Sequence, residues 1–153
     1  MKKELKITII DDEQDVRESI AQWLTLSGFQ TEEFQSAVHA LKVINKNYPG
    51  IIISDIKMPD MDGIEFLKKL MIKDSSIPVI LITGHGDVSM AVEAMHLGAY
   101  DFLEKPFDPN KILEISKRAL INRQLILDNR SLRRELSDGT VLMKKLIGSS
   151  REM

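Results

Sequence analysis

GIIIS, residues 50–54, is an unbroken apolar run that ends at Asp55. Two other runs have the same continuous character, ITII at residues 7–10 and VILI at residues 79–82. Continuous rather than alternating apolar runs are typical of strands that are buried on both faces of a parallel sheet. Helices are therefore expected on both sides of that sheet.

The chain alternates five strand-like segments with five segments of helical apolar spacing. The predicted strands are Lys6 to Ile10, Phe29 to Phe34, Gly50 to Ser54, Pro78 to Ile82 and Tyr100 to Glu104. The predicted helices are Asp15 to Ser27, Ser36 to Asn45, Asp62 to Lys73, Asp87 to Leu97 and a long one from Pro109 to Leu136. Gly28 and Gly98 stand where a helix needs a left-handed exit, and Ser36 and Asp87 can cap helix starts. With right-handed crossovers, this alternation predicts a doubly wound, flavodoxin-like α/β fold of five parallel strands in the order 2-1-3-4-5, with an extended C-terminal helix.

Composition narrows the classes of function. The 153 residues are 43% hydrophobic with a formal net charge of −2, so one core is expected and no overall basic field for nucleic acid. The absence of cysteine excludes disulfides, thiolate metal sites and a cysteine nucleophile, and a reducing cytoplasm is the expected location. No apolar run approaches the roughly 18 residues of a membrane helix, so no membrane segment is expected.

Polar residues follow four of the predicted strands at the point where each strand ends. Asp11 and Asp12 follow the first strand, Asp55 the third, Thr83 the fourth and Lys105 the fifth. Ligands of open parallel sheets bind beyond the carboxyl ends of the strands, where the strand order reverses. Any one of these residues alone is explained as a helix cap or loop residue, but all five at matching ends favour a site.

Three converging carboxylates repel one another, and a hard divalent cation with oxygen ligands relieves that repulsion. Mg²⁺ suits such a site better than Ca²⁺, because it uses one or two carboxylates together with waters and phosphate oxygens. A carboxylate can itself be the nucleophile in phosphoryl transfer, and Asp55 fits that role, with Lys105 and the Thr83 hydroxyl near the transferred group. Pro106 after Lys105 permits a cis or a trans bond, and the sequence does not decide between them.

The patterns IIDDE, IIISDIKMPDMDGIEF, VILITGHGD and YDFLEKPF together resemble the receiver domains of two-component response regulators across residues 1–122. The resemblance implies that Asp55 accepts a phosphoryl group from a histidine kinase. It also implies that Asp12, Asp55 and the backbone carbonyl of Lys57 hold Mg²⁺, with Asp11 helping directly or through a water.

The same resemblance implies a switch rather than an enzyme, with only self-phosphorylation and slow self-dephosphorylation. Thr83 would close on the phosphoryl oxygens, Lys105 would pair with them, and Phe102 would be the aromatic that swings inward. Lys57 and His85 occupy positions that tune the lifetime of the phosphoryl group, although His85 is equally well explained as an ordinary loop histidine.

Two helices carry surplus apolar residues. For the helix at 87–97 we expect one face on the sheet and a second apolar face for a partner, although scattered exposed apolar residues are common. The expected sheet face is Val88, Ala91, Val92 and Met95, and the expected partner face is Met90, Ala94 and Leu97.

The helix at 109–136 is longer than the sheet that it covers, so its far end should project. Ile112, Ile115 and Ala119 are expected to face the core. Two further stripes predict a short two-chain coiled coil, so a homodimer is expected through the 87–97 surface and this helix. These stripes are Leu113, Leu120 and Leu127, and Ile121, Leu125, Leu132 and Leu136, while Arg130, Arg133 and Arg134 are expected to be solvated.

The segments GHGDVSMAVEAMHLGAYDFLEKPF, NRSLRREL and LIGSSREM look like regulators of the DctD and NtrC type, which activate sigma-54 RNA polymerase. That resemblance implies a receiver at 1–122, a helical coiled-coil linker at 123–142 and the first residues of an AAA+ ATPase domain at 143–153. No GxxxxGK[ST] phosphate loop is present, so the chain is not itself the ATPase and is expected to be a fragment of a larger regulator. A stand-alone receiver that acts by protein–protein contact is the alternative.

Two other classes fit the fold but not the motifs. Phosphatases of the haloacid dehalogenase type carry a DxD arrangement after the first strand, whereas this chain has Asp11-Asp12-Glu13. A flavin or nucleotide binder would need a glycine-rich phosphate loop there, and an acidic rim repels an anionic cofactor.

Overall fold

The computed structural model, which describes residues 4–84 and 86–138, has a central sheet of five parallel strands in the order β2-β1-β3-β4-β5. The predicted strand order is confirmed. The strands are β1 (Lys6–Ile10), β2 (Gln30–Phe34), β3 (Gly50–Asp55), β4 (Val79–Thr83) and β5 (Asp101–Glu104). Every residue of β3 and β4 is buried, as their continuous apolar runs predict.

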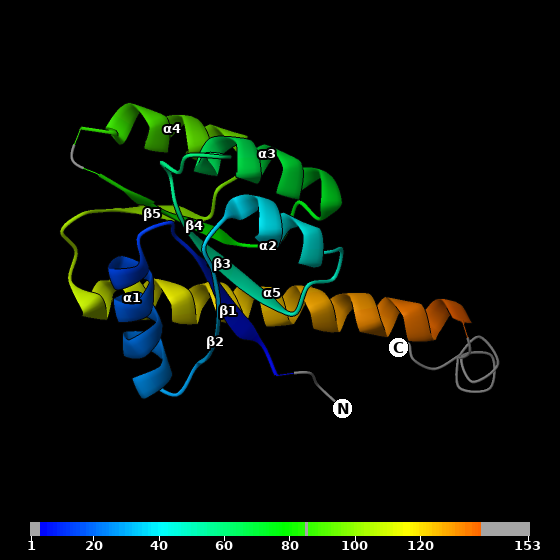
Figure 1. Ribbon diagram of the computed structural model, residues 1–153. Helices are drawn as coiled ribbons and strands as arrows, with labels where there is room; N and C mark the ends of the chain where they lie inside the picture. Colours follow the sequence, from blue (N-terminus) through cyan, green and yellow to red (C-terminus); the bar gives the residue numbers. More distant parts are fainter. Residues whose placement is uncertain (1–3, 85, 139–153) are drawn as a thin grey trace.

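In the described part of the chain, five helices cover the two faces of the sheet (Figure 1). They are α1 (Gln14–Leu26), α2 (Ala37–Val43), α3 (Gly63–Lys73), α4 (Val88–Leu97) and α5 (Pro109–Asp138). Side chains from α1 and α5 form one buried apolar cluster with the sheet, and side chains from α2, α3 and α4 form the other. Within the described ranges, no helix is both long and apolar enough to span a bilayer.

Three of the four predicted helix boundary signals act as expected. Ser36 accepts a hydrogen bond from the Val38 amide at 3.1 Å, and Gly28 and Gly98 have φ of 97° and 115°. Asp87 precedes α4, but its side chain makes no capping bond, so that prediction was wrong. Its carboxylate instead pairs with the Lys57 ammonium at 3.1 Å.

The predicted faces of α4 were largely reversed. Met90, Ala94 and Leu97 pack against the core together with Ala91, which was placed correctly. The exposed face carries Val88, Val92 and Met95 at 44%, 47% and 38% exposure. Both stripes are apolar, so periodicity alone does not choose between them. The two alanines, Ala91 and Ala94, are fully buried, and the face that carries them is the one against the core.

Helix α5 has 30 residues and is therefore about 45 Å long. Its first half packs on the sheet and its far end projects beyond it (Figure 1). Ile112, Ile115 and Ala119 are buried as predicted. Two residues of the predicted Leu113, Leu120 and Leu127 stripe, Leu113 and Leu120, pack against the apolar cluster that α1 and α5 form with the sheet. These two leucines therefore do not need a partner. The second stripe is exposed: Ile121 55%, Leu125 63%, Leu132 59% and Leu136 50%.

The helix runs without a break through residue 122, where the first predicted domain boundary lies. The division into 1–122 and 123–142 therefore stays a prediction. The segment predicted to begin an ATPase domain, 143–153, lies outside the described residues, as does His85.

Candidate metal and phosphoryl site

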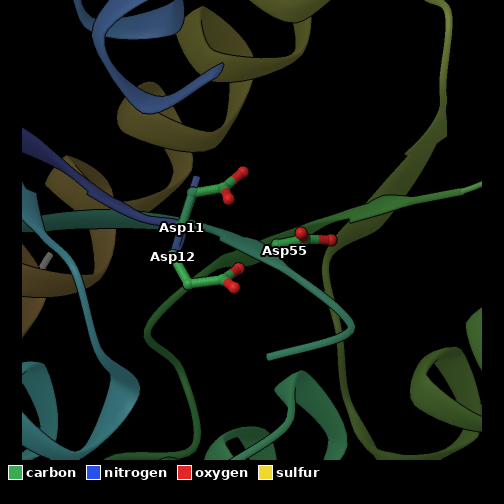
Figure 2. Close-up of side chains that lie close together, drawn as sticks. All are labelled: Asp11, Asp12 and Asp55. Carbon is green, nitrogen blue, oxygen red and sulfur yellow. The ribbon is translucent and has the colours of Figure 1, made fainter. Parts of the chain in front are cut away.

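Three carboxylates meet at the carboxyl ends of β1 and β3 (Figure 2). Asp11 and Asp12 follow β1, Asp55 ends β3, and one oxygen from each lies within 4.8 Å of the others. Asp11 and Asp55 are buried, at 1% and 7% exposure, whereas Asp12 is exposed. Adjacent parallel strands that end at the same level bring the three acids together.

Burial has the largest effect on the pKa of each of the two buried acids. Burial raises the pKa of Asp11 to about 6, although the Glu13 amide donates to its Oδ1 at 2.9 Å. Burial also raises the pKa of Asp55, against the opposing effects of Lys105 and of the Lys57 and Ile56 amides. The Asp11 Oδ2 atom is buried without a hydrogen-bond partner. An orphaned buried oxygen beside two more carboxylates fits a divalent cation with oxygen ligands.

Lys105 reaches this group from the end of β5. Its Nζ lies 3.8 Å from Asp55 Oδ2 and 3.9 Å from Glu13 Oε1. The Lys105–Pro106 bond, which the sequence left open, is cis. Glu13 was not among the predicted site residues, although it is the third acid of the run after β1. Its carboxylate competes with Asp55 for the same ammonium group.

Of the other predicted site residues, Lys57 contacts the acids through its backbone amide, whereas Thr83 and Phe102 have other neighbours. Thr83 is fully buried at the end of β4, and its hydroxyl donates to the Leu103 carbonyl at 3.4 Å. Phe102 on β5 is half-buried and packs against the α2–α3–α4 cluster. Lys57 directs its ammonium to Asp87 and its amide to Asp55.

Gly63, the first residue of α3, lets the loop after Asp55 return close to the strand. A Cβ atom there would lie 2.9 Å from the Asp55 carbonyl oxygen and 2.9 Å from the Ile56 Cα, both backbone atoms. Any side chain at this position would displace the backbone of the site residue itself. The lack of space for a Cβ atom therefore explains why the residue at position 63 is glycine.

Residues 7–117 match the response regulator receiver domain family. The chain belongs to this family. The predicted resemblance is thereby confirmed, and the receiver is a phospho-acceptor switch rather than a member of a catalytic enzyme family. Histidine kinases are the partners of such receivers. Asp11, Asp12 and Asp55 form the acidic site of this receiver.

The receiver is similar to the C4-dicarboxylate transport transcriptional regulatory proteins DctD of Rhizobium meliloti (strain 1021) and Pseudomonas aeruginosa. The first is 45% identical over 128 residues, which cover 84% of this chain and 28% of the relative. The second is 45% identical over 148 residues, which cover 97% of this chain and 32% of the relative. The chain therefore spans less than a third of either DctD protein.

A solved structure gives the same fold. The receiver domain of NtrX from Brucella abortus superposes with a TM-score of 0.71 at 36% identity, over 76% of this chain and 98% of that one. The predicted resemblance to regulators of the DctD and NtrC type is confirmed by these relatives.

Proposed function

We propose that this receiver takes a phosphoryl group from a histidine kinase onto Asp55 in a Mg²⁺-dependent step. The observation that supports Asp55 most strongly is its position: a buried carboxylate at the strand-order reversal, with two further carboxylates and the Lys105 ammonium around it. A carboxylate placed in this way can attack phosphorus while the bond from phosphorus to the donor's nitrogen breaks.

The donor set suits Mg²⁺, which would be held by Asp12, Asp55 and the Lys57 carbonyl, with Asp11 directly or through a water. When bound, the ion neutralises charge on the acids and on the phosphoryl oxygens. Lys105, already beside Asp55, supplies a second positive charge to the same oxygens. These roles are proposals that rest on convergence and on the family resemblance.

The output of the switch is proposed to pass through Thr83 and Phe102. The Thr83 hydroxyl now bonds the Leu103 carbonyl on β5, so its transfer to a phosphoryl oxygen would release that contact between β4 and β5. Phe102 is adjacent to Leu103 and only half-buried, and its inward turn is the movement proposed to follow the loss of that contact. Movement there would reach α4 and α5, which flank β5.

We further propose that the switch sets dimerisation and thereby controls an attached AAA+ ATPase and DNA-binding activator of sigma-54 RNA polymerase, in the cytoplasm. The surfaces available for a second copy are the exposed α4 face (Val88, Val92, Met95) and the α5 stripe (Ile121, Leu125, Leu132, Leu136). The similarity to the DctD transcriptional regulatory proteins supports a receiver that acts on other domains. The net charge of −2 supports a receiver that makes no DNA contact of its own.

Intact-mass spectrometry after incubation with acetyl phosphate and Mg²⁺ tests the acceptor. We expect a gain of one phosphoryl mass in the wild type and in Asp60→Asn, a nearby exposed acid, and no gain in Asp55→Asn or with EDTA. A gain that persists in Asp55→Asn would contradict the assignment.

A further inference from the structure

A second charged cluster lies away from the three acids, where α5 passes the loops that precede β3 and β4. At its centre is Asp74, the residue that directly follows α3, whose side chain is 1% exposed. Arg123 Nη2 lies 3.0 Å from Asp74 Oδ2, and Arg130 Nη1 and Nη2 lie 2.7 and 2.9 Å from Oδ2 and Oδ1. Two arginines of one helix thus share a single buried carboxylate.

The carboxylate itself is held rigidly. The amides of Asn47 and Ser76 and the Ser76 hydroxyl also donate to it, at 3.0, 3.1 and 2.9 Å. Burial would raise the pKa of Asp74, but the hydrogen bonds from Arg130 and Arg123 outweigh it and hold that pKa well below its usual range. Asp74 is therefore charged in the folded protein at ordinary pH.

Arg123 is buried as completely as a core residue. Its side chain has 0% exposure, and besides Asp74 it donates twice to the Tyr48 carbonyl, at 3.1 and 3.0 Å, and to the Ser76 hydroxyl at 3.0 Å. Arg130 adds a bond to the side-chain oxygen of Asn47 at 2.6 Å. The cluster therefore joins both loops to α5.

The kind of contact that holds α5 in place differs between its two halves. Up to Ala119 the inner face of the helix packs apolar side chains into the core. Beyond it, the same face carries Arg123 and, two turns or about 10.5 Å further on, Arg130. A buried ion pair adds little net stability compared with apolar packing, but it demands a specific geometry. Two arginines on one fixed carboxylate restrain both the rotation and the axial position of the helix.

The exposed stripe lies on the opposite side of the helix. At 3.6 residues per turn, Ile121, Leu125, Leu132 and Leu136 lie roughly 140–180° around the axis from Arg123. The contact that fixes the helix and the stripe that faces solvent therefore do not overlap. A second copy can cover the stripe while the arginines remain on Asp74.

We propose that Asp74, Arg123 and Arg130 form a latch that sets the direction and rotation of the distal half of α5 relative to the receiver body. The latch fixes how the stripe is presented; that the stripe then meets a second copy rests on the proposed function. With the latch open, the described part of α5 beyond Ala119 would be held only by half-buried apolar side chains, such as Leu120, because none there is fully buried. Asp74 and the arginines act as positioning residues, far from the phosphoryl chemistry.

Distance measurement between spin labels tests the latch, and the natural absence of cysteine makes the labelling specific. One label at Ile72→Cys, 85% exposed on α3, is paired with Arg133→Cys on the distal part of α5. The matched pair, Ile72→Cys with Lys117→Cys, reports on the proximal part. Labelled chains are diluted with unlabelled chains so that only distances within one chain are read, and no phosphoryl donor is added.

In the wild type we expect a narrow 72–133 distribution. In Asp74→Asn it should broaden and shift, while the 72–117 distribution stays as in the wild type. Arg130→Gln, whose side chain is 31% exposed and which leaves the Asn47 and Ser76 amide bonds to Asp74 in place, should show the same change to a smaller degree. Lys111→Gln, an exposed charge on the same helix, should change neither pair.

Amide hydrogen exchange separates a local latch from a general loss of stability. We expect residues 124–134 to exchange roughly 10- to 100-fold faster in Asp74→Asn, with β3 and β4 unchanged. Unaltered 72–133 distances in both variants would overturn the proposal, as would equal acceleration of α5 and the sheet. Because Asp55 takes no part in these readouts, their failure leaves the phosphoryl proposal standing, and failure of Asp55 labelling leaves the latch standing.

Discussion

Replacement of Asp11 by Asn should stabilise the metal-free receiver. Asp11 is buried, its Oδ2 has no partner, and burial raises its pKa from 3.8 to about 6. Asn keeps the acceptor for the Glu13 amide and removes the charge. A shift of about two pH units corresponds to about 3 kcal/mol at 1.36 kcal/mol per unit.

The sign of the effect follows from the raised pKa. Below pH 3.8 the carboxyl is protonated in both the folded and the unfolded chain, so it has no unfavourable effect on folding. As the pH rises through about 6, the folded protein must ionise a buried acid, and the stability present at low pH is lost. The advantage of Asp11→Asn in EDTA should therefore be largest at pH 7 to 8, up to roughly 6–12 °C in Tm for a domain of this size, and shrink toward pH 4.

Thermal unfolding followed by circular dichroism checks this, with Asp12→Asn as the exposed neighbour that should gain much less. Adding Mg²⁺ at about 100 times its Kd should stabilise the wild type by about 2.7 kcal/mol and both variants by less. The reasoning fails if Asp11→Asn is no more stable than the wild type in EDTA at pH 8. It also fails if Asp12→Asn gains as much as Asp11→Asn.

Three further changes test other parts of the account. Lys105→Met should slow phosphorylation by acetyl phosphate roughly 100-fold, because one positive charge beside Asp55 is lost; time-resolved intact mass measures the rate, and an unchanged rate would remove Lys105 from the site. Leu125→Glu together with Leu132→Glu should shift the chain toward monomer in light scattering, with Lys117→Glu as the control; equal dimerisation of all three proteins would rule out the α5 stripe. Gly63→Ala should lower the free energy of unfolding by roughly 1–3 kcal/mol in a urea titration, because the added Cβ meets backbone at 2.9 Å; exposed Lys68→Ala should not, and a neutral Gly63→Ala would refute the steric argument.

The features that could be predicted from the sequence are those that a short stretch of residues determines by itself. Continuous apolar runs gave the buried strands, and their alternation with helices gave the order of the sheet. Asp11, Asp12, Asp55 and Lys105 each come next to the end of a strand, so parallel pairing alone brings them to one edge. Strand ends are therefore a dependable guide to this kind of site.

Other features depend on three-dimensional choices that no local pattern records. Both stripes of α4 are apolar, so the buried face is decided by how closely the helix packs, and Ala91 and Ala94 allow the close approach. Arg130 was expected to be solvated, but it pairs with Asp74, 56 residues earlier in the chain. Asp87 was expected to cap a helix, but its carboxylate forms an ion pair with the Lys57 ammonium from another loop instead. Ion pairs between residues of different loops leave no repeating pattern in the sequence from which they could be predicted.

Locating the phosphoryl group within the chain tests the central claim most directly. After phosphorylation with acetyl phosphate and Mg²⁺, borohydride reduces an aspartyl phosphate to homoserine, and peptide mass spectrometry then identifies the residue that was converted. We expect homoserine at position 55 and nowhere else. Homoserine at position 11, 12 or 60, with Asp55 intact, would contradict the account.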